Sequence, residues 1–99
     1  MELPIQIDMN TLAAFCRANH IVRLALFGSV LTDRFTADSD VDVLVEFDPA
    51  HIPGMIRLCA MERELSAIVG RKVDMRTPKD LSHYFREEVM KTAVVQYAA

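Results

Sequence analysis

Apolar residues recur along the chain with two different periods, and these periods predict its helices and strands. A helix is expected from a cap at Asp8 or Asn10 to about Asn19, because apolar residues repeat there at helical spacing. The run 21–27, IVRLALF, is rich in apolar residues and carries a single charge, at Arg23. Such a run predicts a central strand that is covered on both faces.

The second predicted strand begins with a pair of acidic residues. The apolar run breaks at Gly28 and Ser29, a polar connection follows, and an alternating pattern resumes over residues 40–47. Residues two apart in a strand point to the same face, so Asp40 and Asp42 project together while the valines beside them face the other way. The pattern therefore predicts a small-residue turn where one strand ends and a carboxylate pair where the next begins.

The remaining pattern predicts a second helix, a third strand and a last helical region. The second helix spans about 53–69 and stops at Gly70, a strand covers 71–76, and Asp80 caps a helical region over about 81–97. The expected fold class is α/β, a small mixed sheet of three or four strands packed with helices. The side chains of the second helix expected to be mostly buried are Ile56, Leu58, Cys59, Leu65, Ile68 and Val69, with Met55 and Met61 as core filler.

The acidic pair and the turn before it suit metal-assisted phosphate chemistry. Like charges on one face repel, and oxygen ligands on a rigid strand suit Mg²⁺ or Mn²⁺. Gly28 lets the backbone approach a ligand, and Ser29 at a helix start favours an anion. If the two strands are neighbours, a nucleoside triphosphate could lie with its terminal phosphates on this turn and its α-phosphate beside Asp40 and Asp42, as metal-dependent nucleotidyl transfer requires.

Two further charged residues are candidates for the same site, and each has an alternative interpretation. Asp74 interrupts the strand 71–76, where an aspartate is unfavourable. It is either a third site carboxylate or an edge-strand charge paired with Lys72 or Arg76. Arg34 lies in the connection between the first two strands and is either a phosphate contact or a solvated loop charge.

The composition limits the classes of function. The chain has 99 residues, which allows one domain over residues 1–99 with a modest core and leaves no room for a separate substrate-binding domain. Its hydrophobic content of 52% is high for so small a domain, which predicts an exposed apolar patch and either a protein partner or self-association. The net charge of -3 has the wrong sign for holding a polyphosphate backbone, which argues against nucleic acid as the main substrate.

The cysteines and the N-terminal segment indicate a cytoplasmic protein. Cys16 and Cys59 lie in apolar helical contexts and make no metal-ligand pattern with the histidines His20, His51 and His83. We expect both cysteines to be reduced and buried. The start MELPIQID lacks a basic region followed by an apolar run, so neither a signal peptide nor a membrane span is predicted.

The acidic and small-residue motifs together resemble a known family. GS at residues 28–29 and DVD at residues 40–42 resemble the GS…DxD signature of the DNA polymerase β-like nucleotidyltransferase superfamily. The short chain, the segment SDVDVLVEF and the segment GRKVDMRTP at residues 70–78 are similar to its smallest branch. That branch contains the minimal nucleotidyltransferases, the MntA-type antitoxins that are paired with HEPN toxins.

The resemblance implies a fold, an activity and a role for each candidate residue. It implies the nucleotidyltransferase fold and transfer of AMP from ATP to a hydroxyl group. Asp40 and Asp42 would hold two Mg²⁺ ions, and Asp74 would be a further ligand and the general base. The phosphates that leave as pyrophosphate would be bound by Gly28, Ser29 and Arg34. Family members commonly carry a basic residue soon after the serine, and here Arg34 would take its place.

The resemblance also implies a protein acceptor, and two alternatives stay open. The acceptor would be an HEPN ribonuclease toxin, which is silenced when a tyrosine near its active site receives AMP. A small-molecule nucleotidyltransferase, acting for example on an aminoglycoside hydroxyl, would share the chemistry but usually has an additional domain. A non-catalytic antitoxin acting by sequestration would be expected to have lost the serine or a carboxylate, and this chain has kept them all.

Overall fold

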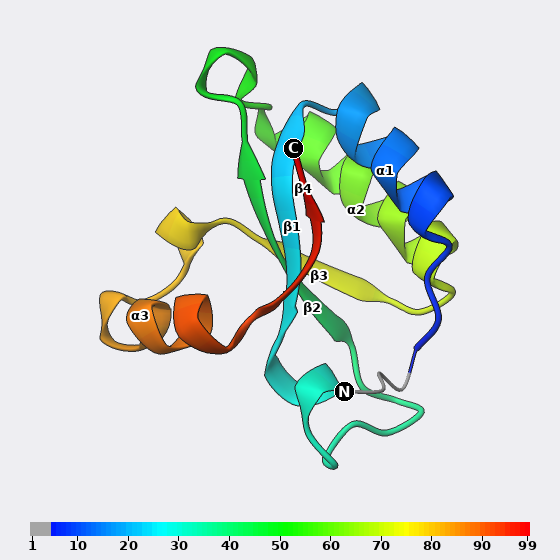
Figure 1. Cartoon of the computed structure of the whole chain (residues 1–99), viewed down its shortest axis with the longest axis vertical. Helices are drawn as coiled ribbons and strands as arrows, with labels where there is room; N and C mark the ends of the chain where they lie inside the picture. The colour runs from blue at the N-terminus through cyan, green and yellow to red at the C-terminus, as the bar shows by residue number, and fades with distance from the viewer. Residues whose placement is uncertain (1–4) are drawn as a thin grey trace.

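Helices and strands alternate along most of the chain in the computed structural model, which describes residues 5–99 (Figure 1). Residues 1–4 lie outside the described residues. They belong to the N-terminal segment in which we predicted neither a signal peptide nor a membrane span. No helix within residues 5–99 combines the length and apolarity needed to cross a membrane. The helices are α1 (Met9–Ala18), α2 (Met55–Val69) and α3 (His83–Thr92), with 3₁₀ turns η1 (Gly28–Leu31), η2 (Pro49–His51) and η3 (Pro78–Asp80). The strands are β1 (Ile21–Phe27), β2 (Val41–Phe47), β3 (Val73–Arg76) and β4 (Val94–Ala98).

The strands form one mixed sheet in the order β3-β2-β1-β4. β1 is antiparallel to both β2 and β4, whereas β2 and β3 run parallel and are connected through α2. The predicted α/β class with a small mixed sheet is therefore confirmed, and β1 is a central strand as expected. This arrangement gathers the end of β1 and the starts of β2 and β3 at one end of the sheet.

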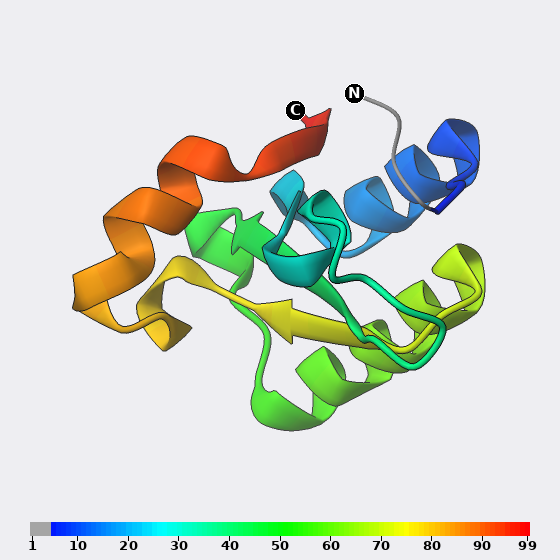
Figure 2. The same ribbon diagram turned by 90° about the horizontal axis from the view of Figure 1, so that it is seen from below.

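Helices α1 and α2 pack against one face of the sheet and against each other (Figure 2). The side chain of Asp8 caps α1 by accepting backbone N–H groups of the first turn, as the sequence predicts. The alternate valines of β2 are buried in the core formed with these helices, which confirms their predicted orientation: Val41, Val43 and Val45. The same alternation leaves Asp42 on the opposite face.

The opposite face of the sheet is only partly covered, so the expectation that β1 is covered on both faces holds at Ala25, which is buried, but not toward the two ends of the strand. Arg23 and Phe27 of β1 are half-exposed, and so is Asp42 of β2. Helix α3 contains no buried residue and lies apart from α1 and α2 in both views (Figures 1 and 2). A ligand can therefore reach the sheet from this open face.

Helix α2 begins at Met55 rather than at Pro53 and buries a narrower stripe than the sequence predicts. Gly70 ends the helix in the left-handed conformation with φ 77°, as predicted. The buried residues recur every four positions along one line that faces the sheet: Met61, Leu65 and Val69. Three residues predicted to be buried are exposed because no other segment within residues 5–99 covers their side of the helix: Met55, Ile56 and Cys59.

The C-terminal segment is part helix and part strand, so the prediction of one helical region over about 81–97 is wrong. Ser82, rather than Asp80, caps α3, which ends at Thr92. The valines and the tyrosine that follow have strand propensity, and they pair with the free edge of β1 as β4. Apolar periodicity alone did not separate this short strand from the helix before it.

Candidate active site

The turn after β1 places Gly28 directly against Asp42 of the next strand. Gly28 has φ +77°, and a Cβ atom added to it would overlap the carboxylate oxygen Oδ2 of Asp42. Phe27 and Asp42 are partners in the antiparallel register of β1 and β2, which explains this close approach. Glycine is required at this position both for its backbone conformation and for the space it leaves to the carboxylate.

Asp42 and Asp74 are direct neighbours across strands β2 and β3. They occupy paired positions in the parallel register, so their side chains emerge on the same face of the sheet. Asp40 immediately precedes β2, at a point where the Val41 N–H donates to the Lys72 carbonyl oxygen at 2.8 Å. The structure thus places all three candidate carboxylates at one end of the sheet.

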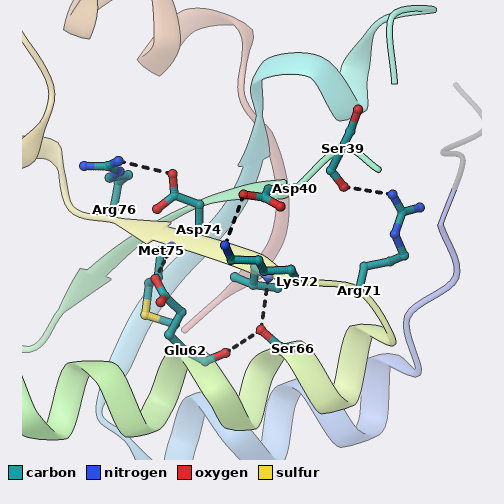
Figure 3. A network of polar contacts seen from close by, with 10 residues as sticks. Ser39, Asp40, Glu62, Ser66, Arg71, Lys72, Asp74, Met75 and Arg76 are labelled. Carbon is teal, nitrogen blue, oxygen red and sulfur yellow. Dashed lines mark hydrogen bonds and ion pairs between the residues drawn. The ribbon is translucent and has the colours of Figure 1, made fainter. Parts of the chain in front are cut away.

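Two basic side chains, one just before β3 and one at its end, form ion pairs with Asp40 and Asp74 (Figure 3). Arg76 Nη2 donates to Asp74 Oδ2 at 3.2 Å, and Lys72 Nζ lies 3.9 Å from Asp40 Oδ2. The Arg76 pair is the alternative that the sequence leaves open for Asp74. Partly exposed pairs of this kind contribute about 0–1 kcal/mol, so a bound divalent cation can replace them.

The environment of Asp42 opposes its negative charge. Burial raises the pKa of Asp42 above its ordinary value, the neighbouring charges of Asp74 and Asp40 raise it further, and Arg76 offsets part of this effect. Ionising Asp42 is therefore costly in the protein alone. A cation bound between these carboxylates would remove that cost, because it favours the charged form.

The chemistry of these donors fits a hard divalent cation, although their oxygens are not gathered around one point. Within residues 5–99, no group of three histidine, cysteine, aspartate or glutamate side chains is close enough to hold a metal ion. Carboxylate oxygens are nevertheless the protein ligands that Mg²⁺ takes. Asp40 and Asp74 would have to exchange their ion pairs for the metal. The assignment of Mg²⁺ to Asp40, Asp42 and Asp74 stays a prediction.

Arg71, which our reasoning from the sequence missed, holds the connection that leads to Asp40. Its Nη2 atom donates to three backbone carbonyl oxygens, those of Thr36 at 2.7 Å, Ala37 at 3.1 Å and Ser39 at 2.8 Å. Figure 3 shows the bond to Ser39. The guanidinium also lies 4.5 Å from the ring centre of Phe35. A single arginine whose acceptors are distant in the sequence gives no local pattern, so only the fold shows this role.

A groove in two adjoining parts runs along the open face at this end of the sheet. The larger part, about 720 Å³, lies between η1 and α3. The smaller part, about 310 Å³, is lined by Asp42 and Asp74. Phe27 and Phe85 line both parts, so the two are continuous. The site therefore extends from the turn after β1 to the paired carboxylates.

The larger part of the groove contains the remaining candidate residues. Gly28, Ser29 and Arg34 line one wall, and residues of α3, including Phe85, line the other. The position of Arg34 is compatible with the phosphate interpretation, which stays a prediction. The contribution of α3 to this wall was not predicted from the sequence.

A small mixed sheet in which a glycine-serine turn faces paired strand carboxylates defines the class of nucleotidyltransferase-fold proteins. Residues 9–95 match the family described as the nucleotidyltransferase domain. The chain therefore belongs to the nucleotidyltransferase domain family.

Two relatives are similar in sequence to more than half of this chain. The protein adenylyltransferase MntA of Thermococcus cleftensis is 31% identical over 71 residues, which cover 72% of this chain and 70% of that protein. A Methanocaldococcus jannaschii protein named "Putative protein adenylyltransferase MJ1379" is 38% identical over 58 residues, 59% of this chain. The matched part spans 58% of the length of the latter relative.

Solved structures of similar proteins share the fold. One, a "putative minimal nucleotidyltransferase", has a TM-score of 0.67 and 28% identity, with 90% of this chain and 96% of that chain covered. Another, a toxin-antitoxin structure with AMP-PNP, has a TM-score of 0.73 at 19% identity, with 94% of this chain and 75% of that chain covered. The likeness to the second structure concerns the fold alone.

Proposed function

We propose that this chain is a protein adenylyltransferase antitoxin that transfers AMP from ATP to a hydroxyl group, expected to be a tyrosine, of an HEPN-type toxin. The observation that carries the proposal is the register pair of Asp42 and Asp74 beside the Gly28 turn. The name of the Thermococcus cleftensis relative and the toxin-antitoxin complexes among the similar structures support the substrate class. Neutralising the toxin would follow from the modification.

The proposed transfer is a displacement at the α-phosphorus of ATP. The acceptor hydroxyl oxygen forms a bond to this phosphorus, the bond to the oxygen that bridges to the β-phosphate breaks, and pyrophosphate leaves. Asp74 accepts the hydroxyl proton, for which its half-buried position on the smaller part of the groove leaves access. Mg²⁺, when bound by Asp40, Asp42 and Asp74, would supply positive charge for the triphosphate.

The remaining side chains of the site bind and orient the reacting groups. Ser29 and Arg34 line the larger part of the groove, where they would hold the phosphates that leave as pyrophosphate. Arg76 holds Asp74 at 3.2 Å and would release it when the acceptor enters. Phe27 and Phe85 give the junction of the two parts an apolar surface.

Intact-mass spectrometry of the toxin tests the proposal. A purified HEPN-type toxin from the same organism is incubated with ATP, Mg²⁺ and this protein, and we expect the toxin to gain one or more AMP masses. Asp42→Asn and Asp74→Asn are expected to lower the rate at least about 1000-fold because each removes a metal ligand, and Asp74→Asn also removes the general base. The matched control is Asp33→Asn, an exposed carboxylate in the connection between β1 and β2. An unmodified toxin with the parent protein present would contradict the proposal.

The same variants separate catalysis from sequestration. A triple variant with asparagine at Asp40, Asp42 and Asp74 cannot transfer AMP. We therefore expect it to leave the toxin's ribonuclease activity uninhibited. If the triple variant protects an RNA substrate as well as the parent protein does, the chain acts by sequestration. Transfer of AMP to an aminoglycoside in place of the toxin would instead favour the small-molecule alternative.

A further inference from the structure

Three large apolar side chains are exposed around the start of α2. The exposed fractions are 66% for Ile52, 75% for Met55 and 89% for Ile56. We call these three residues the α2 patch. Exposing this much apolar surface at neighbouring positions is unfavourable in water and is typical of a surface that binds a protein.

The α2 patch is continuous with the candidate active site. A groove of about 300 Å³ extends from Met55 along α2 to Asp74, Arg76 and Asp80. The same three β3 and η3 residues line the smaller part of the active-site groove. An extended segment lying in the groove from the α2 patch would therefore bring its side chains to the Asp74 carboxylate.

Two polar side chains of α2 that face β3 are already hydrogen-bonded within the fold. Glu62 Oε2 accepts the Met75 N–H at 2.9 Å, and Ser66 Oγ accepts the Val73 N–H at 3.0 Å (Figure 3). These bonds occupy outward N–H groups of the edge strand β3, so a partner cannot add a strand there. The surface that remains for a partner is the apolar one at the start of α2.

The two ends of the groove differ in character. Arg34 and Ser29 lie at the end beyond Phe27 and Phe85, where a triphosphate can be held. The opposite end, beyond Asp74, reaches the α2 patch at Met55. We infer that the acceptor toxin docks on the α2 patch and reaches Asp74 along α2, while ATP occupies the end beside η1. This inference rests on the proposed function, since it takes the acceptor to be a protein.

The test compares patch variants with a matched control. The double variant Met55→Ser with Ile56→Ser removes the apolar contact surface. Because both positions are exposed, the midpoint temperature of thermal unfolding should be unchanged. The control is Met9→Ser, which alters another exposed methionine, 48% exposed, at the start of α1. With the HEPN-type toxin as the varied substrate, we expect the double variant to raise KM for the toxin at least tenfold and to leave KM for ATP unchanged.

Two further measurements make the test independent of catalysis. Calorimetry of toxin binding without ATP or metal should show the same loss of affinity in the double variant and none in the control. Cys59, which lines the groove, should react with maleimide more slowly when the toxin is bound.

The inference is overturned if the double variant binds the toxin and modifies it with the parent's KM. It is also overturned if light scattering shows that the α2 patch pairs two copies of this chain and the monomeric double variant still transfers AMP normally. Failure of the proposed function has a different signature. In that case the parent protein adds no AMP, yet calorimetry still shows whether the patch binds the toxin.

Discussion

Gly28 and Asp42 approach so closely that a side chain at position 28 would overlap the Asp42 carboxylate. The glycine directly follows β1 and the aspartate is the second residue of β2, so this contact joins the turn that is expected to bind phosphate to the carboxylates that are expected to bind metal. The chain can hold both groups within the reach of one ligand only if residue 28 lacks a Cβ atom.

Substituting Gly28 with alanine should therefore harm both stability and catalysis. The left-handed backbone at φ +77° costs about 1–2 kcal/mol for alanine, and the overlap displaces Asp42 in addition. The matched control is Gly70→Ala, since Gly70 has the same φ but open space where the Cβ would lie. The midpoint temperature of thermal unfolding should be lower in both variants than in the parent protein, and AMP transfer should be lost only in Gly28→Ala. Equal activity in the two variants would show that the contact with Asp42 is unimportant.

Replacing Asp42 with asparagine should stabilise the fold at neutral pH while it abolishes transfer. Burial and the charges of Asp74 and Asp40 raise the pKa of Asp42 above its unfolded value of 3.8. Between these two pKa values the folded state binds more protons than the unfolded state, so the free energy of unfolding falls as pH rises through this window. Above this pH window Asp42 is charged in the folded parent protein, and the free energy of unfolding is lowered by the full cost of that charge.

The direction of this pH dependence can be tested by measuring the stability of Asp42→Asn in the absence of metal. Denaturant unfolding at pH 7 should show the variant to be more stable than the parent, and the difference should shrink as the pH is lowered toward about 4 and be lost below it. Asp33→Asn, in the exposed connection, serves as the control. A variant less stable than the parent at pH 7 would mean that Asp42 is favourably paired in the folded protein. Adding Mg²⁺ should stabilise only the parent if the ion binds there.

The sequence predicted the local elements of the site better than the surfaces around it. Strand alternation placed Asp42 opposite its neighbouring valines, because the period of a strand fixes which residues share a face. It could not show that Asp74 is the register partner of Asp42, since pairing between distant segments depends on the whole sheet. The exposed side of α2, including Ile56, was predicted to be buried because helical spacing identifies a stripe but not its width.

Arg71 should be needed to keep the connection before Asp40 in place. Its guanidinium donates to three carbonyl oxygens of this connection, and bonds from a charged donor contribute about 1.5–3 kcal/mol when they are not exposed. Since Arg71 is half-buried, we expect Arg71→Ala to cost about 1–2 kcal/mol in the free energy of unfolding.

The effect of Arg71→Ala on function should exceed its effect on stability. Without these bonds Asp40 is no longer fixed beside Asp42, so affinity for Mg²⁺ in the transfer reaction should fall while KM for the toxin is unchanged. Arg71→Lys should restore little, because lysine lacks the planar guanidinium that stacks on Phe35. Arg63→Ala, an exposed arginine on α2, is the control for loss of one positive charge. Loss of stability with a normal Mg²⁺ dependence would limit Arg71 to a structural role.

The two cysteines should differ sharply in reactivity, although the sequence predicted both to be buried. Cys16 lies on the buried face of α1, and burial raises the pKa of its thiol to about 11. Cys59 is exposed on α2. Because the thiolate is the reactive form, the native protein at pH 8 should release one equivalent of thionitrobenzoate rapidly from Ellman's reagent, and the unfolded protein two. Cys59→Ser should abolish the rapid phase. Two rapid equivalents from the native protein would mean that α1 opens from the sheet readily enough to expose Cys16.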